Sequence, residues 1–311
     1  MTYFCVTIDT ECDMPNWKPK KLPTLENIKE LPKLQELLNK YEIKPTYLIT
    51  YPVATEAISV DILKTLHKVN NCEIGTHFHP WTTPPIKNEE IEEATFPHKL
   101  DINLHKLKLT NLTNAIKKSF NINPVSYRAG RFGFDSIGLK IIEDLNYKID
   151  TSITPLTNWG ANFTNAPIEP YFLHHNNLSN PGKSKVLEVP VTIDIDIPIK
   201  IKKLYGKSPE KIKGFISLLG IKRVWLRPSI SSSRDMIKLS NKLIENNHTV
   251  LNMMFHSNEL SIKTSPFNNT KLKLENYYNR LGEYFKFINK NKIESKTLHE
   301  FYKIYVNNIN Y

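Results

Sequence analysis

The chain has 311 residues, of which 40% are hydrophobic, and it carries a formal net charge of +11. The length suits a single α/β barrel, and the scattered prolines and glycines exclude a collagen-like or low-complexity chain. Because the lysines are spread over the whole chain, the charge indicates a solvated surface that attracts sugar nucleotides, lipid phosphates or acidic glycans. We expect no nucleic-acid partner.

The three cysteines form no Cys-x-x-Cys pair, which argues against a disulfide framework and against a cysteine zinc site. Residues 1–8 lead directly into a strand-like segment and lack the pattern of a secretory signal. We find no run of about eighteen apolar residues that would predict a membrane span. The sequence therefore predicts a cytoplasmic protein, with peripheral attachment to the inner membrane left open.

Strand-like and helix-like segments alternate along the first half of the chain. Short apolar runs rich in β-formers predict strands at residues 3–8, 46–50, 72–79 and 125–129. Apolar residues at helical spacing predict helices at residues 27–41, 54–69, 98–119 and 135–145. Pro32 is expected to kink or shorten the first helix. In the second, we expect Ile58, Ile62, Leu63 and Leu66 to point inward.

The second half continues the alternation after one long interruption. Strands are predicted at residues 147–152, 186–193 and 250–255, and residues 155–185 are interpreted as a loop. Helices are predicted at residues 209–219, 233–246, 272–290 and 295–306. Alternating strands and helices indicate a parallel sheet, and the absence of a glycine-rich nucleotide loop favours a barrel over a Rossmann sheet. We expect a catalytic barrel over residues 1–270 and a helical extension packed on it over residues 271–311.

Ionisable side chains stand at the carboxyl ends of five predicted strands. They are Asp9 and Glu11, His77 and His79, Arg128, Asp150, and His256. In parallel barrels this rim is where active sites form. The sequence therefore predicts one functional site that draws residues from distant parts of the chain.

Spacing supports a metal site at this rim. Residues two apart on a strand point to the same side, so His77 and His79 can converge on one point, and Asp9 and Glu11 can do likewise. Two imidazoles and a carboxylate with open positions are typical of catalytic zinc or iron. Taken alone, His77 and His79 are equally compatible with surface histidines.

The other candidates carry structural alternatives. Arg128 and Arg131 lie among glycines on a rim loop, where a guanidinium can hold a carboxylate in a bidentate pair or form a surface salt bridge. Asp150 is also consistent with a simple turn. Trp81 and Trp159 can stack on sugar rings or pack a lid. Three further arginines are interpreted either as contacts for a phosphate or acidic sugar or as solvated surface: Arg223, Arg227 and Arg234.

Five segments, taken in order, resemble the motifs of the polysaccharide deacetylases (NodB homology, carbohydrate esterase family four). They are Thr7–Glu11, Gly75–Pro80, Tyr127–Gly133, Asp150 with Ser152 and Trp159, and Met253–His256. The resemblance covers residues 1–266 and is closest to a divergent branch associated with cell-surface glycan loci. It implies a distorted, incomplete β/α barrel of about seven parallel strands and a divalent metal, zinc or alternatively nickel, cobalt or iron.

The resemblance also implies roles. Asp9 would be the general base, Arg128 would orient it, and His256 would be the general acid, with Asp150 or Arg128 holding the protonation states apart. His77 and His79 would bind the metal. The substrate would be an N-acylated, most simply N-acetylated, aminosugar in a cell-surface glycan precursor, nucleotide- or lipid-linked. Trp81, Arg131 and Trp159 would contact this substrate.

Two departures from the family pattern leave alternatives open. The family places a second Asp directly after the base, where this chain has Thr10, so Glu11 is the nearest carboxylate that can complete the metal site. The family also separates its two histidines by three residues, and this chain by one. Asp9 as ligand with Glu11 as base is the reverse assignment. A metal-free hydrolase of cyclic amides or ureides and a glycan-binding pseudoenzyme are the rival functions.

Overall fold

The computed structural model describes residues 1–17, 24–70, 72–86, 95–195, 208, 212 and 223–309. Its centre is a sheet of eight strands in the order β12-β1-β2-β3-β4-β5-β9-β8. The strands are β1 (Tyr3–Thr10), β2 (Pro45–Ile49), β3 (Glu73–Phe78), β4 (Ser126–Ala129), β5 (Ile149–Asp150), β8 (Tyr171–Phe172), β9 (Leu187–Glu188) and β12 (Val250–His256). Seven of them are parallel, and only β8 runs antiparallel, at one edge.

The curved sheet is an incomplete barrel, as the sequence predicts. At its β12 edge, irregular backbone replaces a further strand. The Thr192 amide donates to the Asn252 carbonyl at 3.0 Å, and the Met254 amide donates to the Leu226 carbonyl at 3.0 Å. These bonds satisfy edge groups that would otherwise need water. The adjoining strands β10 (Ile193–Ile195) and β11 (Arg223–Trp225) form their own antiparallel pair.

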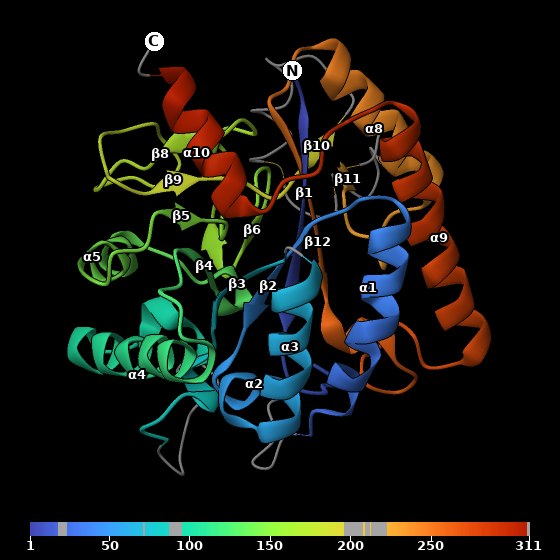
Figure 1. The fold of residues 1–311 in the computed structure, drawn as a ribbon. Helices are drawn as coiled ribbons and strands as arrows, with labels where there is room; N and C mark the ends of the chain where they lie inside the picture. The colour runs from blue at the N-terminus through green and yellow to red at the C-terminus, as the bar shows by residue number, and fades with distance from the viewer. Residues whose placement is uncertain are drawn as a thin grey trace.

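Helices connect the strands and cover the outside of the sheet (Figure 1). The longer ones are α1 (Leu31–Lys40), α3 (Ala57–Asn70), α4 (Ile102–Phe120), α5 (Ser136–Asp144), α8 (Ser233–Glu245), α9 (Lys271–Lys290) and α10 (Leu298–Ile309). The short ones are η1 (Glu26–Glu30), α2 (Tyr51–Thr55), η2 (Pro80–Thr82), η4 (Pro97–Lys99), η5 (Gly130–Phe132) and η6 (Ser257–Leu260). Asp101, Asp135, Ser232 and Thr270 cap four helices by accepting backbone N–H bonds.

Two predicted helices are divided in the structure. Pro32 stands in the first turn of α1, where its missing N–H costs nothing, and the residues before it form η1. The segment predicted at 54–69 is split between α2 and α3. Leu63 and Leu66 are buried as expected, but Ile58 is 57% exposed, so its inward assignment is wrong. The break before α3 shifts the buried face away from this residue.

The segment predicted as a loop contains short strands. Residues 155–185 hold β8 and the hairpin of β6 (Asn158–Trp159) and β7 (Ala161–Asn162). Strands of two residues are too short to give a periodic signal in the sequence. The helix predicted at 209–219 lies outside the described residues. Within the described part of the chain, none of the helices has the length and apolarity needed to cross a bilayer.

The C-terminal helices pack against the N-terminal strand. On α9, the Tyr284 ring lies 5.6 Å from Phe4, and the Tyr277 ring lies 6.2 Å from Phe255 on β12. On α10, the Phe301 ring lies 6.1 Å from Tyr3. These aromatic side chains belong to the barrel's buried core, and each contributes about 1.5–3 kcal/mol by leaving water. A division of the chain at residue 270 stays a prediction.

Candidate active site

The carboxyl ends of β1, β3, β4 and β12 meet at one end of the barrel. Register places Asp9 beside His256 and His77 beside Arg128 on neighbouring strands. A cavity of about 480 Å³ opens here. We call it the first cavity. Its polar floor consists of Asp9, Glu11, His77, His79 and His256. Five of the predicted strand-end residues therefore lie together at one rim of the sheet.

Asp9 is held by Arg128. The Arg128 Nη1 donates to Asp9 Oδ1 at 2.6 Å, through one nitrogen rather than the bidentate pair that the sequence suggests. Arg128 is fully buried, and its other N–H groups donate to the Thr151 carbonyl at 2.8 Å and to Thr7 Oγ1 at 2.8 Å. These bonds fix the guanidinium, so the Asp9 carboxylate is fixed as well.

The surroundings of Asp9 keep it ionised. Burial alone would raise its pKa, but the Arg128 guanidinium, together with the nearby imidazoles of His77 and His256, outweighs burial and holds the pKa well below its usual value. The second oxygen, Oδ2, lies 3.6 Å from His77 Nε2 and 3.7 Å from His256 Nε2. An ionised carboxylate oxygen therefore stands between two histidines and faces the cavity.

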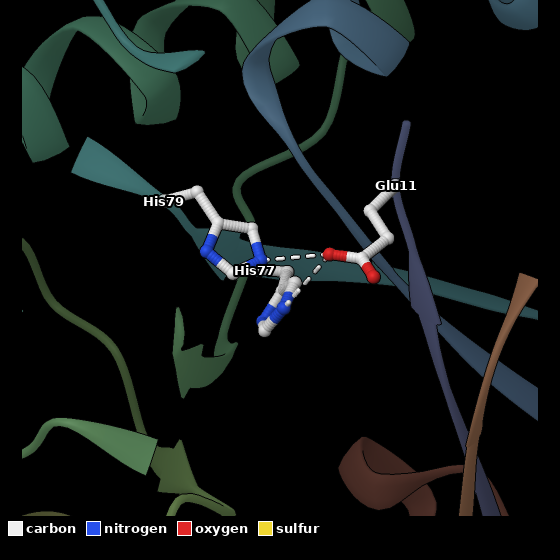
Figure 2. A group of neighbouring side chains, drawn as sticks. All are labelled: Glu11, His77 and His79. Carbon is white, nitrogen blue, oxygen red and sulfur yellow. Dashed lines mark hydrogen bonds and ion pairs between the residues drawn. The ribbon is translucent and has the colours of Figure 1, made fainter. Parts of the chain in front are cut away.

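Glu11, His77 and His79 converge on a second point (Figure 2). Glu11 Oε2 lies 2.7 Å from His79 Nε2 and 3.8 Å from His77 Nε2. One ligand atom from each residue lies within 4.8 Å of the other two, and all three residues are buried. Asn258 Nδ2 donates to the other Glu11 oxygen at 3.0 Å and so orients the carboxylate.

The protonation states of the two histidines suit a metal. Burial lowers the pKa of His77 to about 4 and that of His79 to about 3, so both imidazoles are neutral at neutral pH. His77 Nδ1 donates to the Arg128 carbonyl at 3.2 Å, which leaves the lone pair on Nε2. A ligand histidine fixed in this way through its other nitrogen is typical of metal sites. The donor set of two nitrogens and one carboxylate fits a divalent metal with open positions.

Gly130 makes the close packing around His79 possible. A Cβ atom at this position would lie 2.3 Å from His79 Nδ1 and 2.5 Å from the Phe78 carbonyl oxygen. No other residue fits without displacing the histidine. The rim loop that follows β4 therefore needs glycine here, and the next residue, Arg131, has a φ of 54°.

His256 faces Asp9 across the floor and is oriented from behind. Glu259 Oε1 lies 2.9 Å from His256 Nδ1, and Arg227 Nη2 donates to the same oxygen at 2.7 Å. Tyr277 on α9 donates to the other Glu259 oxygen at 3.2 Å. Burial raises the pKa of Glu259, but Arg227 and His256 outweigh burial and lower it to about 2. An ionised Glu259 therefore directs Nε2 of His256 toward the cavity.

Sequence reasoning does not single out Glu259. Its signal is the spacing of three residues from His256, because His256 ends β12 and Glu259 lies in η6, the single turn that follows. Without knowing that β12 ends in such a turn, a glutamate in this segment is indistinguishable from a surface residue. Arg227 was expected to contact a phosphate, an acidic sugar or solvent, and its observed partner is Glu259.

Asp150 is not brought into the first cavity. It is fully buried on β5, where its carboxylate accepts bonds from the Ser152 hydroxyl at 2.6 Å and the Ser152 amide at 3.2 Å. Ser152 Oγ in turn accepts from the Ala129 amide at 2.8 Å. Asp150 therefore supports the end of β4 from behind, and its side chain also hydrogen-bonds Glu188 on β9.

The cavity walls are aromatic. The chain has four tryptophans, and all four line the first cavity: Trp17, Trp81, Trp159 and Trp225. Phe96, Phe132 and Phe267 complete the wall. The Trp159 ring stacks on Trp225 at 5.4 Å and is 38% exposed, and the Trp81 ring lies 4.0 Å from the His79 ring. Flat apolar surfaces beside a polar floor fit the faces of a sugar ring.

Arg131 also lines the first cavity. Its guanidinium lies 4.4 Å from the Phe96 ring centroid, and its Nη1 donates to Thr95 Oγ1 at 2.5 Å. The three expected substrate contacts, Trp81, Arg131 and Trp159, therefore share one cavity with the ionisable floor. Trp17, Phe132 and Phe267 are wall residues that the sequence analysis did not identify.

Comparisons with known proteins support the fold. A protein from Parabacteroides distasonis with the provisional name glycoside hydrolase/deacetylase matches with a TM-score of 0.62 and 12% identity, over 97% of this chain and 71% of that one. A GH57-type branching enzyme from Pyrococcus horikoshii matches with a TM-score of 0.55 and 10% identity, over 96% and 69%. These likenesses support the incomplete β/α barrel, which is the fold that the five motifs imply.

A further structure, from Mycobacterium smegmatis and provisionally named a polysaccharide deacetylase, matches with a TM-score of 0.48 and 13% identity, over 94% of this chain and 93% of that one. No family model and no curated protein matches the sequence.

Proposed function

We propose that the protein is a metal-dependent hydrolase that removes an N-acyl group, most simply N-acetyl, from an aminosugar during cell-surface polysaccharide biosynthesis. The observation that carries this proposal is that a cluster of metal-ligand type and an ionised carboxylate lie side by side on the floor of the first cavity. The cluster of Glu11, His77 and His79 lies beside the Asp9–Arg128 pair, and His256 stands next to Asp9 on the neighbouring strand. This arrangement supplies metal ligands, a base and an acid within one aromatic cavity.

Glu11, His77 and His79 would hold the metal, with zinc favoured and nickel, cobalt or iron as alternatives. A divalent metal in this position supplies Lewis-acid polarisation of the acyl carbonyl and acidifies a water molecule. Asp9 would accept the proton of the attacking water on Oδ2. Arg128 keeps that carboxylate ionised and pointed at the cavity. The reverse assignment, with Asp9 as ligand, is disfavoured because Glu11 Oε2 lies close to both histidines, 2.7 Å from His79 and 3.8 Å from His77, whereas Asp9 is already paired with Arg128.

His256 would act on the leaving group. An amide nitrogen leaves poorly unless it gains a proton, and His256 Nε2 lines the first cavity 3.7 Å from Asp9 Oδ2. Ionised Glu259 stabilises the protonated imidazole and holds its tautomer. Asp150 would contribute only through Ser152 and the end of β4. Trp81, Arg131 and Trp159 would hold the aminosugar, with the precursor carried on a nucleotide or a lipid in the cytoplasm or at the inner membrane.

Metal analysis of the purified protein tests this proposal. We expect about one equivalent of a divalent metal in the wild type and none in His77→Ala/His79→Ala. Release of acetate from N-acetylated aminosugars should disappear with the metal and return when metal is added to chelated wild type. His175→Ala is the matched control, because this histidine pairs with Glu143 on the surface. Absence of metal from wild type, even after adding it back, would contradict the proposal and favour a metal-free hydrolase or a glycan-binding protein.

A further inference from the structure

A second cavity of about 570 Å³ adjoins the first cavity. The two share Phe267, which lines both. Their chemistry differs. The first cavity has aromatic walls, whereas the second is lined by Lys273, Asn276 and Arg280 from α9 together with Ser229 and other polar residues. A ligand that occupies both would therefore have an apolar-faced ring at one end and a strongly polar group at the other.

The polar lining comes largely from one face of α9. Lys273, Asn276 and Arg280 stand three, four and seven residues apart, so their side chains follow one another along the helix surface. Lys and Arg supply cationic donors, and Asn supplies amide donors. The lining also contains the carboxylate of Glu283, which accepts a hydrogen bond from Ser233 Oγ. The positive groups therefore outnumber the negative one.

Arg280 has no ion-pair partner for its charge within the described part of the chain. Its Nε atom is buried without a hydrogen-bond partner, and its guanidinium lies 6.0 Å from the Tyr277 ring centroid. Among the described residues, no carboxylate forms an ion pair with Arg280. By contrast, Lys271 on the same helix lies 3.9 Å from Glu275. A partly buried guanidinium that the protein leaves unneutralised is suited to an anionic ligand.

The second cavity is joined to the catalytic floor by direct contacts. Arg227 Nε donates to Ser229 Oγ in the second cavity at 3.0 Å, while its Nη2 holds Glu259 behind His256. Tyr277, one turn before Arg280, donates to the same glutamate. Residues that orient His256 therefore contact the lining of the second cavity, so a ligand in this cavity would lie close to the catalytic floor.

We infer that the second cavity binds the phosphate or diphosphate group of a phosphate-linked aminosugar whose ring occupies the first cavity. This inference rests on the proposed function and narrows its substrate to a glycosyl phosphate or diphosphate rather than a finished neutral polymer. Arg280 offers a planar fork for phosphate oxygens, and Lys273 adds a second charge. A nucleoside diphosphate and a prenyl diphosphate share this chemistry.

The test is binding of two diphosphates to the metal-loaded protein at fixed ionic strength, measured by calorimetry. The probes are uridine diphosphate and geranyl diphosphate, with uridine and geraniol as phosphate-free controls. We expect at least one diphosphate to bind and to lose about tenfold or more in affinity in Arg280→Gln and in Lys273→Gln, because bonds to charged groups are being removed. Lys271→Gln should bind as wild type does. The diphosphate that binds more tightly identifies the carrier.

Equal binding of diphosphates by wild type and Arg280→Gln, or no binding to wild type, overturns the inference. Lys273 is exposed, so Lys273→Gln keeps the test valid if Arg280→Gln does not fold. Acetate release from N-acetylated aminosugars is assayed separately. Arg280-dependent diphosphate binding without acetate release from any substrate would refute the proposed function alone. Acetate release without such binding would refute only this inference.

Discussion

Two buried carboxyl groups on the same sheet behave in opposite ways. Asp9 on β1 and Glu188 on β9 are 1% and 0% exposed, so both have left water completely. For Asp9, burial raises the pKa, but the nearby Arg128 guanidinium outweighs burial, and the pKa lies well below its usual value. For Glu188, burial and the neighbouring Asp150 carboxyl group act in the same direction, and together they raise the pKa well above its usual value. Burial alone therefore does not fix the charge of a carboxyl group. The neighbouring charge does.

The difference follows the geometry of the sheet. Asp9 stands at the rim, beside a guanidinium fixed by Thr7 and Thr151, and faces the first cavity. Glu188 stands in register with Asp150 on the neighbouring strand, and the two carboxyl groups share a hydrogen bond. Two carboxylates in such contact cannot both be ionised cheaply, so the pair retains a proton. Asp9 therefore lines the candidate site in its ionised form, whereas the Glu188–Asp150 pair is a polar contact inside the sheet.

Replacing Arg128 should have the largest effect, because it removes the charge that keeps Asp9 ionised. In Arg128→Met, Asp9 loses its partner and stays buried, so we expect the free energy of unfolding to fall by about 3–5 kcal/mol. We expect kcat/KM to fall by about 10²–10⁴-fold, because the proposed base is no longer held. Denaturant unfolding and steady-state kinetics measure the two effects.

The control for this substitution is Lys106→Met. Lys106 pairs with Asp144 at 2.6 Å, but both side chains are more than half exposed, so the loss should stay below about 1 kcal/mol. If the two substitutions cost the same, the buried pair is no stronger than a surface pair, and the interpretation of Asp9 is wrong.

Substitutions around His256, the proposed general acid, should lower activity less strongly. In Glu259→Gln, His256 loses the charge that stabilises its protonated form, and we expect kcat to fall by about 10–100-fold with KM nearly unchanged. Tyr277→Phe removes only the 3.2 Å bond to Glu259 and should lower kcat by less than about fivefold. Steady-state kinetics on protein with a checked melting temperature separate the variants. A wild-type kcat in Glu259→Gln would show that Glu259 does not serve His256.

Glu188→Gln should have the smallest effect, and it should stabilise the protein instead of weakening it. Because the folded protein raises the pKa of Glu188, its contribution to stability is complete below the unfolded value near 4.3 and declines as pH rises. Glutamine keeps a donor for Asp150 and carries no proton to lose. We therefore expect the melting temperature to rise by about 2–4 °C at pH 8, with the gain shrinking toward pH 5. A destabilised variant at pH 8 would show that Glu188 is ionised and useful there.

The local features of the site were predictable from the sequence. Asp9 with Glu11, and His77 with His79, alternate along strands whose ends lie at one rim of a parallel sheet. Arg128 is predictable as a partner because it ends the strand next to His77. The starts predicted at residues 135 and 233 lie within one residue of α5 and α8, which Asp135 and Ser232 cap, whereas the helix predicted from residue 98 begins only after Asp101.

Features that depend on distant packing were not predictable. Asp150 ends a strand like its neighbours, yet it bonds Ser152 and Glu188 instead of lining the cavity. Glu259 has no distinguishing local pattern, and its role arises from Arg227 and from Tyr277 on α9. Phe267 and Trp17 lie in irregular segments and become cavity walls only when the chain has folded.

The sequence by itself determined which ionisable side chains stand at the rim of the sheet. Period-two alternation along each strand and the parallel arrangement of the strands dictate which side chains reach that rim. Only the tertiary structure decided which carboxyl groups are charged and which residues shape the cavities. Those properties depend on electrostatic and packing contacts between residues far apart in the chain, such as Asp9 with Arg128 and Glu259 with Tyr277. No local pattern encodes such contacts.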